Sequence, residues 1–186
     1  MNFELSEEQK MIQQNVERFV QDNYDLPKRV ELSSQDPGYS KDYWNSMAEL
    51  GWLGLPFNEE DGGFGGNQID TLVIMEQFGK GLVLEPFLAN VVLGGGAIQI
   101  GGSEELKNEM LSSLIEGSKQ LTLAYAEQQS RFDLEDVATS ARQEGDKYII
   151  NGQKSMVLNA ESSDHIVVVT RTNGGQVDEE GITLFL

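Results

Sequence analysis

Three features of the sequence could carry chemistry: a run of carboxylates, a single histidine and a glycine-rich loop. Two of the three residues Asp133, Glu135 and Asp136 could form an acid/base pair, because two carboxyl groups in different environments can donate and accept protons at one site. We interpret them instead as a solvated loop that follows Phe132. His165 is the only histidine, and no His, Cys, Asp or Glu residues accompany it at the spacing of metal ligands. The sequence therefore predicts a structural role for His165 and no metal site.

The glycine-rich loop spans residues 59–66 and reads Glu-Glu-Asp-Gly-Gly-Phe-Gly-Gly. Loops of this kind can bind phosphate through backbone N–H groups when they join a strand to a helix and carry Lys followed by Ser or Thr. Here no strand precedes the loop, no such pair follows it, and its three carboxylates would repel a phosphate. We therefore expect a tight connection between two helices.

A β-meander is predicted in the second half of the chain. Residues 137–144 and 148–150 have the composition of strands and flank Gly145-Asp146, a two-residue turn that tolerates positive φ. Asn151-Gly152 is a second hairpin signal, which predicts that residues 153–158 return as a third strand. Further strands are expected at residues 165–170 and 182–186.

Motifs on either side of this hairpin resemble those of a known family. An alanine-rich segment ends in Ala-Tyr-Ala-Glu127, and the hairpin is followed by Lys154 and by Val-Leu-Asn159. This order resembles the middle domain of the flavin-dependent acyl-CoA dehydrogenases, in which the first motif reads Thr-Glu-Pro-x-x-Gly-Ser-Asp and the last reads Lys-x-Trp-Ile-Thr-Asn. Asp133, Lys154 and Asn159 match these motifs.

Two parts of the motifs differ. Arg131-Phe132 replaces the family's Gly-Ser, and Met156, Val157 and Leu158 replace its Trp-Ile-Thr. The variant resembles a divergent branch that includes the small subunits of pimeloyl-CoA-type dehydrogenases, which work as heteromers with a second, related chain. The similarity covers all 186 residues, which correspond to about the first half of a family member.

The resemblance implies an FAD-dependent enzyme that introduces an α,β double bond into a CoA thioester. Its electrons would pass to an electron-transfer flavoprotein. The residues that the resemblance places against the flavin ring are Leu123, Tyr125, Ala126, Met156, Val157 and Leu158. Ala126 and Leu158 stand where the family has threonine, so the flavin would depend on backbone N–H groups and apolar packing. The alternative is that these residues are core positions of a sheet.

The resemblance also implies a place for the substrate. Phe132 falls where a family serine meets substrate or pyrophosphate, and Ala89, Gly94 and Gly95 lie on the helix that lines the acyl pocket. Glycine is unfavourable within a helix, so these residues could leave room for a bulky acyl group. A helix break or a close helix crossing would explain them equally well. The family's catalytic Glu comes from a C-terminal helical domain, and no catalytic residue is assigned within residues 1–186.

The predicted fold is α+β, with an all-helical bundle over residues 1–119 and an incomplete antiparallel β-domain over residues 120–186. Helix starts are indicated by Ser6, Asn67 and Ser103, each of which can accept hydrogen bonds from free N–H groups of the first turn. Further helices are expected before Gly51 and after Pro86. The segment after Pro86 is apolar but is interrupted by polar residues and three glycines, which argues against a membrane span.

Composition excludes several classes of function. The formal net charge of −18 opposes binding to nucleic acid or to an anionic membrane surface. The chain has no cysteine, so disulfides and thiolate sites are excluded, and its start lacks the pattern of a signal peptide. We expect a cytoplasmic protein. Because the strand at residues 182–186 would expose an unpaired edge, we also expect a longer chain that forms a homo- or hetero-oligomer.

Two functional hypotheses follow. In the first, the chain is the N-terminal portion of an FAD-dependent acyl-CoA dehydrogenase, inactive on its own because it lacks the catalytic base. In the second, it belongs to a non-catalytic, flavin-poor subunit that supports a related chain by assembly.

Overall fold

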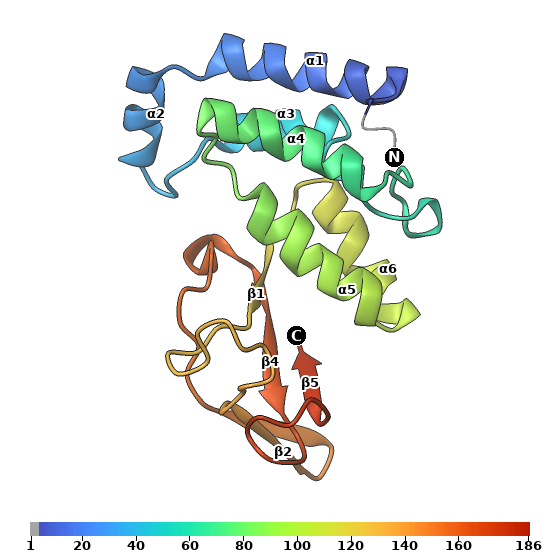
Figure 1. Ribbon diagram of the computed structural model, residues 1–186, viewed down its shortest axis with the longest axis vertical. Helices are drawn as coiled ribbons and strands as arrows, with labels where there is room; N and C mark the ends of the chain where they lie inside the picture. Colours follow the sequence, from blue (N-terminus) through green and yellow to red (C-terminus); the bar gives the residue numbers. More distant parts are fainter. Residues whose placement is uncertain (1–3) are drawn as a thin grey trace.

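The computed structural model describes residues 4–186 and shows a helical part followed by a sheet, arranged end to end along the long axis (Figure 1). The helical part contains α1 (Glu7–Asn23), α2 (Leu26–Ser33), α3 (Lys41–Glu49), η1 (Glu59–Asp61), α4 (Gln68–Gly81), η2 (Leu88–Gly95), α5 (Gly96–Gly101) and α6 (Glu104–Ile115). The second part contains β1 (Leu121–Ala124), β2 (Ser140–Glu144), β3 (Lys147–Asn151), η3 (Ala160–Ser162), β4 (His165–Arg171) and β5 (Ile182–Phe185). The α+β class is confirmed, whereas the division at residue 119 stays a prediction.

The predicted helix starts are confirmed by their caps. The Ser6 hydroxyl accepts from the N–H of Gln9 at 3.1 Å, and the Gln9 side chain accepts from the Ser6 N–H at 3.0 Å. Asn67 forms the same reciprocal pair with Asp70. Helix α2 was not predicted, although Asp25 caps it and a proline stands in its first turn, which is a recognisable start signal. None of the helices within residues 4–186 is long and apolar enough to cross a membrane.

The sheet is mixed, which corrects the expectation of an antiparallel domain. Strand β4 lies at its centre and pairs in parallel with β1, in parallel with β2 through one residue pair, and antiparallel with β5. Only β2 and β3 form the predicted hairpin, which turns at Gly145 with φ of 63°. Antiparallel neighbours can be joined by a short turn, but the β1–β4 pair is made by segments distant in sequence, which local turn signals do not reveal.

The predicted third strand at residues 153–158 is wrong. The segment leaves the sheet after β3, and Met156 and Asn159 take left-handed φ values of 53° and 56° that a strand does not allow. Glycine is needed at position 152 because the backbone there packs closely against Thr139, not because it forms a turn. A Cβ at Gly152 would lie 2.4 Å from the Thr139 hydroxyl oxygen. Residues 153–158 therefore pass over the segment before β2 and return beside the end of β1.

One hydrophobic core joins the helical part to the sheet. It includes Trp44, Phe57 and Leu114 from the helical part and extends to Leu121 in β1 and Val167 in β4. The N–H of Leu121 donates to the side-chain oxygen of the fully buried Asn90 at 2.9 Å. The start of β1 is thus fixed by the π-helical segment η2.

Gly94 and Gly95 serve this close packing. A Cβ at Gly94 would lie 2.8 Å from the Cβ of Leu121, and one at Gly95 would lie 2.5 Å from the ring of the buried Phe57. The space that their missing side chains leave is therefore already filled. The contacts favour the alternative of a close crossing, and the acyl-pocket role of these two glycines stays a prediction.

This packing predicts different effects of alanine on stability at two neighbouring glycines. Gly95→Ala should lower the free energy of unfolding by ~1–3 kcal/mol, because Phe57 and Leu114 would have to move. Gly96→Ala meets open space in the same helical run, so the better helix propensity of alanine should leave stability unchanged or raise it by up to ~1 kcal/mol. Urea denaturation of both variants measures this difference, and equal destabilisation would contradict the close-packing role.

Candidate functional site

The structure brings the end of β1 and the segment 154–158 side by side. The N–H of Ser155 donates to the carbonyl of Ala126 at 2.9 Å, and the hydroxyl of Thr122 donates to the carbonyl of Leu158 at 2.5 Å. These bonds join residues about thirty positions apart in the chain. The two segments to which the sequence analysis assigned the flavin ring therefore form one continuous surface.

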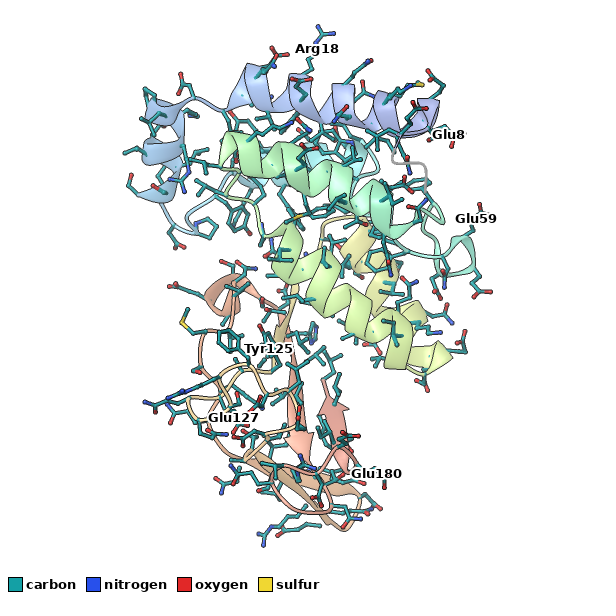
Figure 2. All side chains as sticks on the ribbon, viewed as in Figure 1. Glu8, Arg18, Glu59, Tyr125, Glu127 and Glu180 are labelled. Carbon is teal, nitrogen blue, oxygen red and sulfur yellow. The ribbon has the colours of Figure 1, made fainter. Side chains whose placement is uncertain are left out.

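Large side chains on this surface face outward. Tyr125, Met156 and Leu158 are 42%, 84% and 45% exposed, and Tyr125 points away from the sheet in Figure 2. Ala126, Val157 and Leu123 are half-buried, and Leu123 packs against the core. We call the exposed side chains of Tyr125, Met156 and Leu158 the apolar face. Exposed apolar side chains that two segments bring together make a candidate binding surface.

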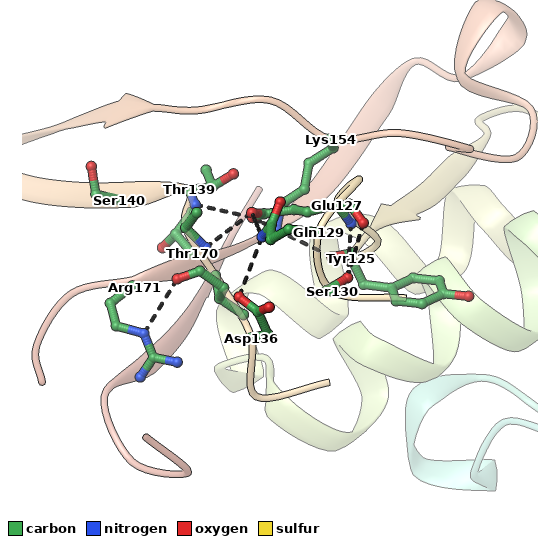
Figure 3. A network of polar contacts seen from close by, with 12 residues as sticks. Tyr125, Glu127, Gln129, Ser130, Asp136, Thr139, Ser140, Lys154, Thr170 and Arg171 are labelled. Atoms are coloured by element: carbon green, nitrogen blue, oxygen red, sulfur yellow. Dashed lines mark hydrogen bonds and ion pairs between the residues drawn. The ribbon is translucent and has the colours of Figure 1, made fainter. Parts of the chain in front are cut away.

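A buried ion pair lies directly behind the apolar face. The Lys154 ammonium donates to the Glu127 carboxylate at 2.7 Å and to the carbonyl of Tyr125 at 3.2 Å. The side chains of Glu127 and Lys154 are only 2% and 7% exposed. The carboxylate also accepts from the Gln129 side chain and from the N–H groups of Ala138 and Thr139 (Figure 3).

These donors change the acidity of Glu127. Burial raises the pKa of its carboxyl group, but the hydrogen bonds from Lys154, Gln129 and the Thr139 backbone outweigh burial and lower the pKa to about 2. Glu127 is therefore ionised at neutral pH and is suited to hold positions, not to exchange protons. Glu127 and Lys154 were recognised from the sequence only as parts of a motif, because two charges far apart in a sequence do not reveal that they pair.

Arg171, which the sequence analysis did not consider, is a second buried cation in the sheet. Arg171 is 7% exposed, and its guanidinium donates to backbone carbonyls. The carbonyls that accept from it belong to Glu135, Val137, Gln176, Asp178 and Glu180. Arg171 thereby fastens the segment before β2 to the loop before β5. Figure 3 shows it on the opposite side of this segment from Glu127.

The predicted substrate residues do not come together. Phe132 is 96% exposed on the loop after β1, whereas Ala89 is buried in η2 with Gly94 and Gly95. An apolar groove of about 450 Å³, which was not predicted from the sequence, lies between α4 and the helical run of η2 and α5. Leu72, Met75, Leu88, Val92 and Ile100 are among the residues that line it. Its signal in the sequence was the breadth of the apolar stripe on α4, of which Leu72 is 65% exposed.

The other chemical candidates have local roles. Asp136 accepts hydrogen bonds from Gln129 and Gln176, while Asp133 and Glu135 are exposed. His165 is half-buried at the start of β4. Within residues 4–186, no group of three or more carboxylate or histidine side chains is placed to hold a metal ion. In the glycine-rich loop a Cβ at Gly63 would lie 2.2 Å from the carbonyl oxygen of Phe57, so this loop is a tight connection.

Comparison with known proteins agrees with this arrangement. Residues 6–118 match the model of the acyl-CoA dehydrogenase N-terminal domain, and residues 122–186 match that of the middle domain. The chain therefore belongs to the acyl-CoA dehydrogenase family. It is 33% identical over 184 residues to a probable acyl-CoA dehydrogenase of Bacillus subtilis (strain 168), covering 98% of this chain and 48% of the relative.

Two further similarities concern a complex and a cofactor. The chain is 28% identical to the CarC subunit of the caffeyl-CoA reductase-Etf complex of Acetobacterium woodii, covering 98% of this chain and 48% of that subunit. It also superimposes on a solved FAD complex of PigA with a TM-score of 0.84 and 26% identity, covering 100% of this chain and 49% of the other. The chain thus spans about half the length of the relatives that it matches.

The low pKa of Glu127 predicts a pH-dependent contribution to stability. Its pKa in the folded protein is about 2, against an ordinary value of 4.5, so its stabilising effect is complete above about pH 5 and is lost as the pH falls towards 2. Glu127→Gln should lower the free energy of unfolding by about 3 kcal/mol at pH 7, because it leaves the Lys154 charge buried without its partner. This difference from the wild type should shrink between pH 5 and pH 2.

Chemical denaturation at several pH values measures the difference. Glu179→Gln removes an exposed carboxylate from the same part of the chain and is the matched control. A gap between Glu127→Gln and the wild type that stays constant down to pH 2 would show that the carboxylate is not held ionised by these donors.

Proposed function

We propose that this chain supplies the flavin-binding face of an FAD-dependent acyl-CoA dehydrogenase, which forms an α,β double bond in a CoA thioester. The observation that carries the proposal is the apolar face, where Tyr125 from one segment and Met156 and Leu158 from another are held side by side. Family membership and the FAD complex of a related structure support it.

The residues present fit a flavin ring. An isoalloxazine is flat and largely apolar on its faces, and the exposed side chains of Tyr125 and Met156 offer it an apolar surface. Ala126 and Leu158 carry no hydroxyl, so polar atoms of the ring would depend on main-chain groups of residues 125–126 and 156–158. The chemistry that FAD supplies when bound is acceptance of a hydride from the β-carbon of the substrate.

The chain's own contribution is to bind and orient. The apolar face excludes water from one side of the ring, and the buried ion pair behind it keeps the two segments together. We assign no residue to proton removal, since Glu127 is ionised and fully occupied by donors. The acyl-CoA substrate and an electron-transfer flavoprotein as electron acceptor belong to the proposal, and Phe132 is proposed as a substrate contact.

A second function is favoured by one specific observation, the absence of hydroxyls at Ala126 and Leu158. A ring site without these groups binds flavin more weakly, as expected for a supporting subunit of a heteromeric dehydrogenase. The similarity to a subunit of a larger complex makes this alternative concrete. In that case the protein would be purified with little flavin and together with a second, related chain.

The visible absorption spectrum of the purified protein distinguishes the two functions. We expect a bound flavin near one per chain. A protein that contains no flavin, takes up none when FAD is added, and co-purifies with a related flavin-containing chain would overturn the first function and support the second.

The apolar face makes a further prediction that does not depend on turnover. Met156→Glu should weaken FAD binding by at least about tenfold, because a charge would be buried against the ring. Met11→Glu makes the same change on the exposed side of α1 and should leave FAD affinity unchanged. Fluorescence titration of the apoprotein with FAD measures both, and equal affinities would show that the flavin does not lie on this face.

A further inference from the structure

Lys154 links the two segments that form the apolar face. It belongs to the segment that carries Met156 and Leu158, and its side chain bonds to Tyr125 and Glu127 at the end of β1. Its ammonium reaches back to the carbonyl of Tyr125 at 3.2 Å while its neighbour Ser155 bonds to Ala126. Two residues later, Met156 turns outward with a left-handed φ of 53°. The position of the Met156 side chain therefore depends on how Lys154 is anchored.

The charge of Lys154 is already neutralised. Its ammonium lies 2.7 Å from the Glu127 carboxylate, and both side chains are buried behind the face. Because the pair has no net charge, its field at the face is weak, and it offers no free cation to an anionic ligand. The role left to Lys154 is to hold the two segments at a fixed distance, since its ammonium makes two hydrogen bonds to residues at the end of β1.

We propose that Lys154 is a positioning residue for the flavin ring, which sets the spacing between Tyr125 on one side of the apolar face and Met156 and Leu158 on the other. This inference rests on the proposed function. It adds to that function the residue on which the width of the ring site depends. The Lys154 side chain itself is buried and bonds to the Glu127 carboxylate and to the Tyr125 carbonyl.

Arg171 provides the comparison that separates positioning from stability. It is also a buried cation that holds main-chain carbonyls, but the groups that it holds are at residues 135–137 and 176–180, away from both segments of the apolar face. A general loss of stability should follow from removing either cation. A change in the ring site should follow only from changing Lys154.

The experiment compares Lys154→Met, Lys154→Arg and Arg171→Met with the wild type. For each protein, FAD affinity and the visible circular dichroism of the bound flavin are measured well below the thermal midpoint, and the midpoint is measured separately. Lys154→Arg keeps the charge but replaces a compact ammonium by a planar fork, so it changes the spacing without leaving Glu127 unpaired. It keeps the test valid if Lys154→Met does not fold.

We expect Lys154→Met to bind FAD at least about tenfold more weakly. Lys154→Arg should bind several-fold more weakly, with altered circular dichroism of the flavin. Arg171→Met should lower the thermal midpoint and keep the wild-type affinity and spectrum. Wild-type affinity and spectrum in both Lys154 variants would overturn the inference while leaving the proposed function intact. Failure of the wild type to bind FAD would overturn the proposed function and this inference together.

Discussion

A carboxylate buried in a sheet must find donors for its oxygens, and this requirement sets the path of the chain around Glu127. Its donors are a side chain two residues later, two N–H groups just before β2, and the ammonium of Lys154 beyond the β2–β3 hairpin. Without them, the charge would be too costly to bury. The end of β1, the approach to β2 and the segment 154–158 are therefore held around one side chain.

Arg171 extends this organisation to the other side of the same segment. Glu127 takes the N–H groups of Ala138 and Thr139, and Arg171 takes the carbonyls of Glu135 and Val137. A stretch with little regular structure is thus held through both kinds of backbone group. The loop before β5 is tied to it by the same guanidinium, so the irregular parts of the sheet gain a fixed shape without strand pairing.

The helical part fixes where this sheet begins. Asn90 bonds to the start of β1, and Gln120 contacts the Tyr39 hydroxyl and the side chain of Asn159. Nearby, the buried Glu85 accepts from the Tyr24 hydroxyl and from the N–H of Ser40, and burial raises the pKa of its carboxyl group. These polar contacts accompany the shared core, so the apolar face stands at a defined position relative to the groove beside α4.

Local signals in the sequence were reliable where the structure is local. The caps at Ser6 and Asn67 and the turn at Gly145 each depend on neighbours within a few residues, and each is found as expected. The parallel pairing of β1 with β4 depends on residues about forty positions apart, and the Glu127–Lys154 pair also joins residues that are distant in sequence. Asn151-Gly152 led to the wrong prediction of a second hairpin, because glycine is required at position 152 by the close contact with Thr139 and not by a turn.

The site residues divide in the same way. Resemblance to the family was sufficient to predict that Tyr125 and Met156 share one surface, since each lies in a motif that is a short, continuous run of sequence. It did not reveal that Leu121 and Phe57 occupy the space beside Gly94 and Gly95, because a sequence motif does not show which distant residues pack together. Arg171 had no signal, since a cation bound only by backbone carbonyls needs no partner of particular type.

The central claim is that Glu127 and Lys154 act as one unit in holding the site. A double-mutant cycle on the free energy of unfolding, with Glu127→Gln, Lys154→Met and the two combined, tests it most directly. We expect the combined variant to be more stable than the sum of the single losses implies, by at least about 1 kcal/mol, because neither charge is then left buried alone. Losses that add to within about 0.3 kcal/mol would contradict the claim.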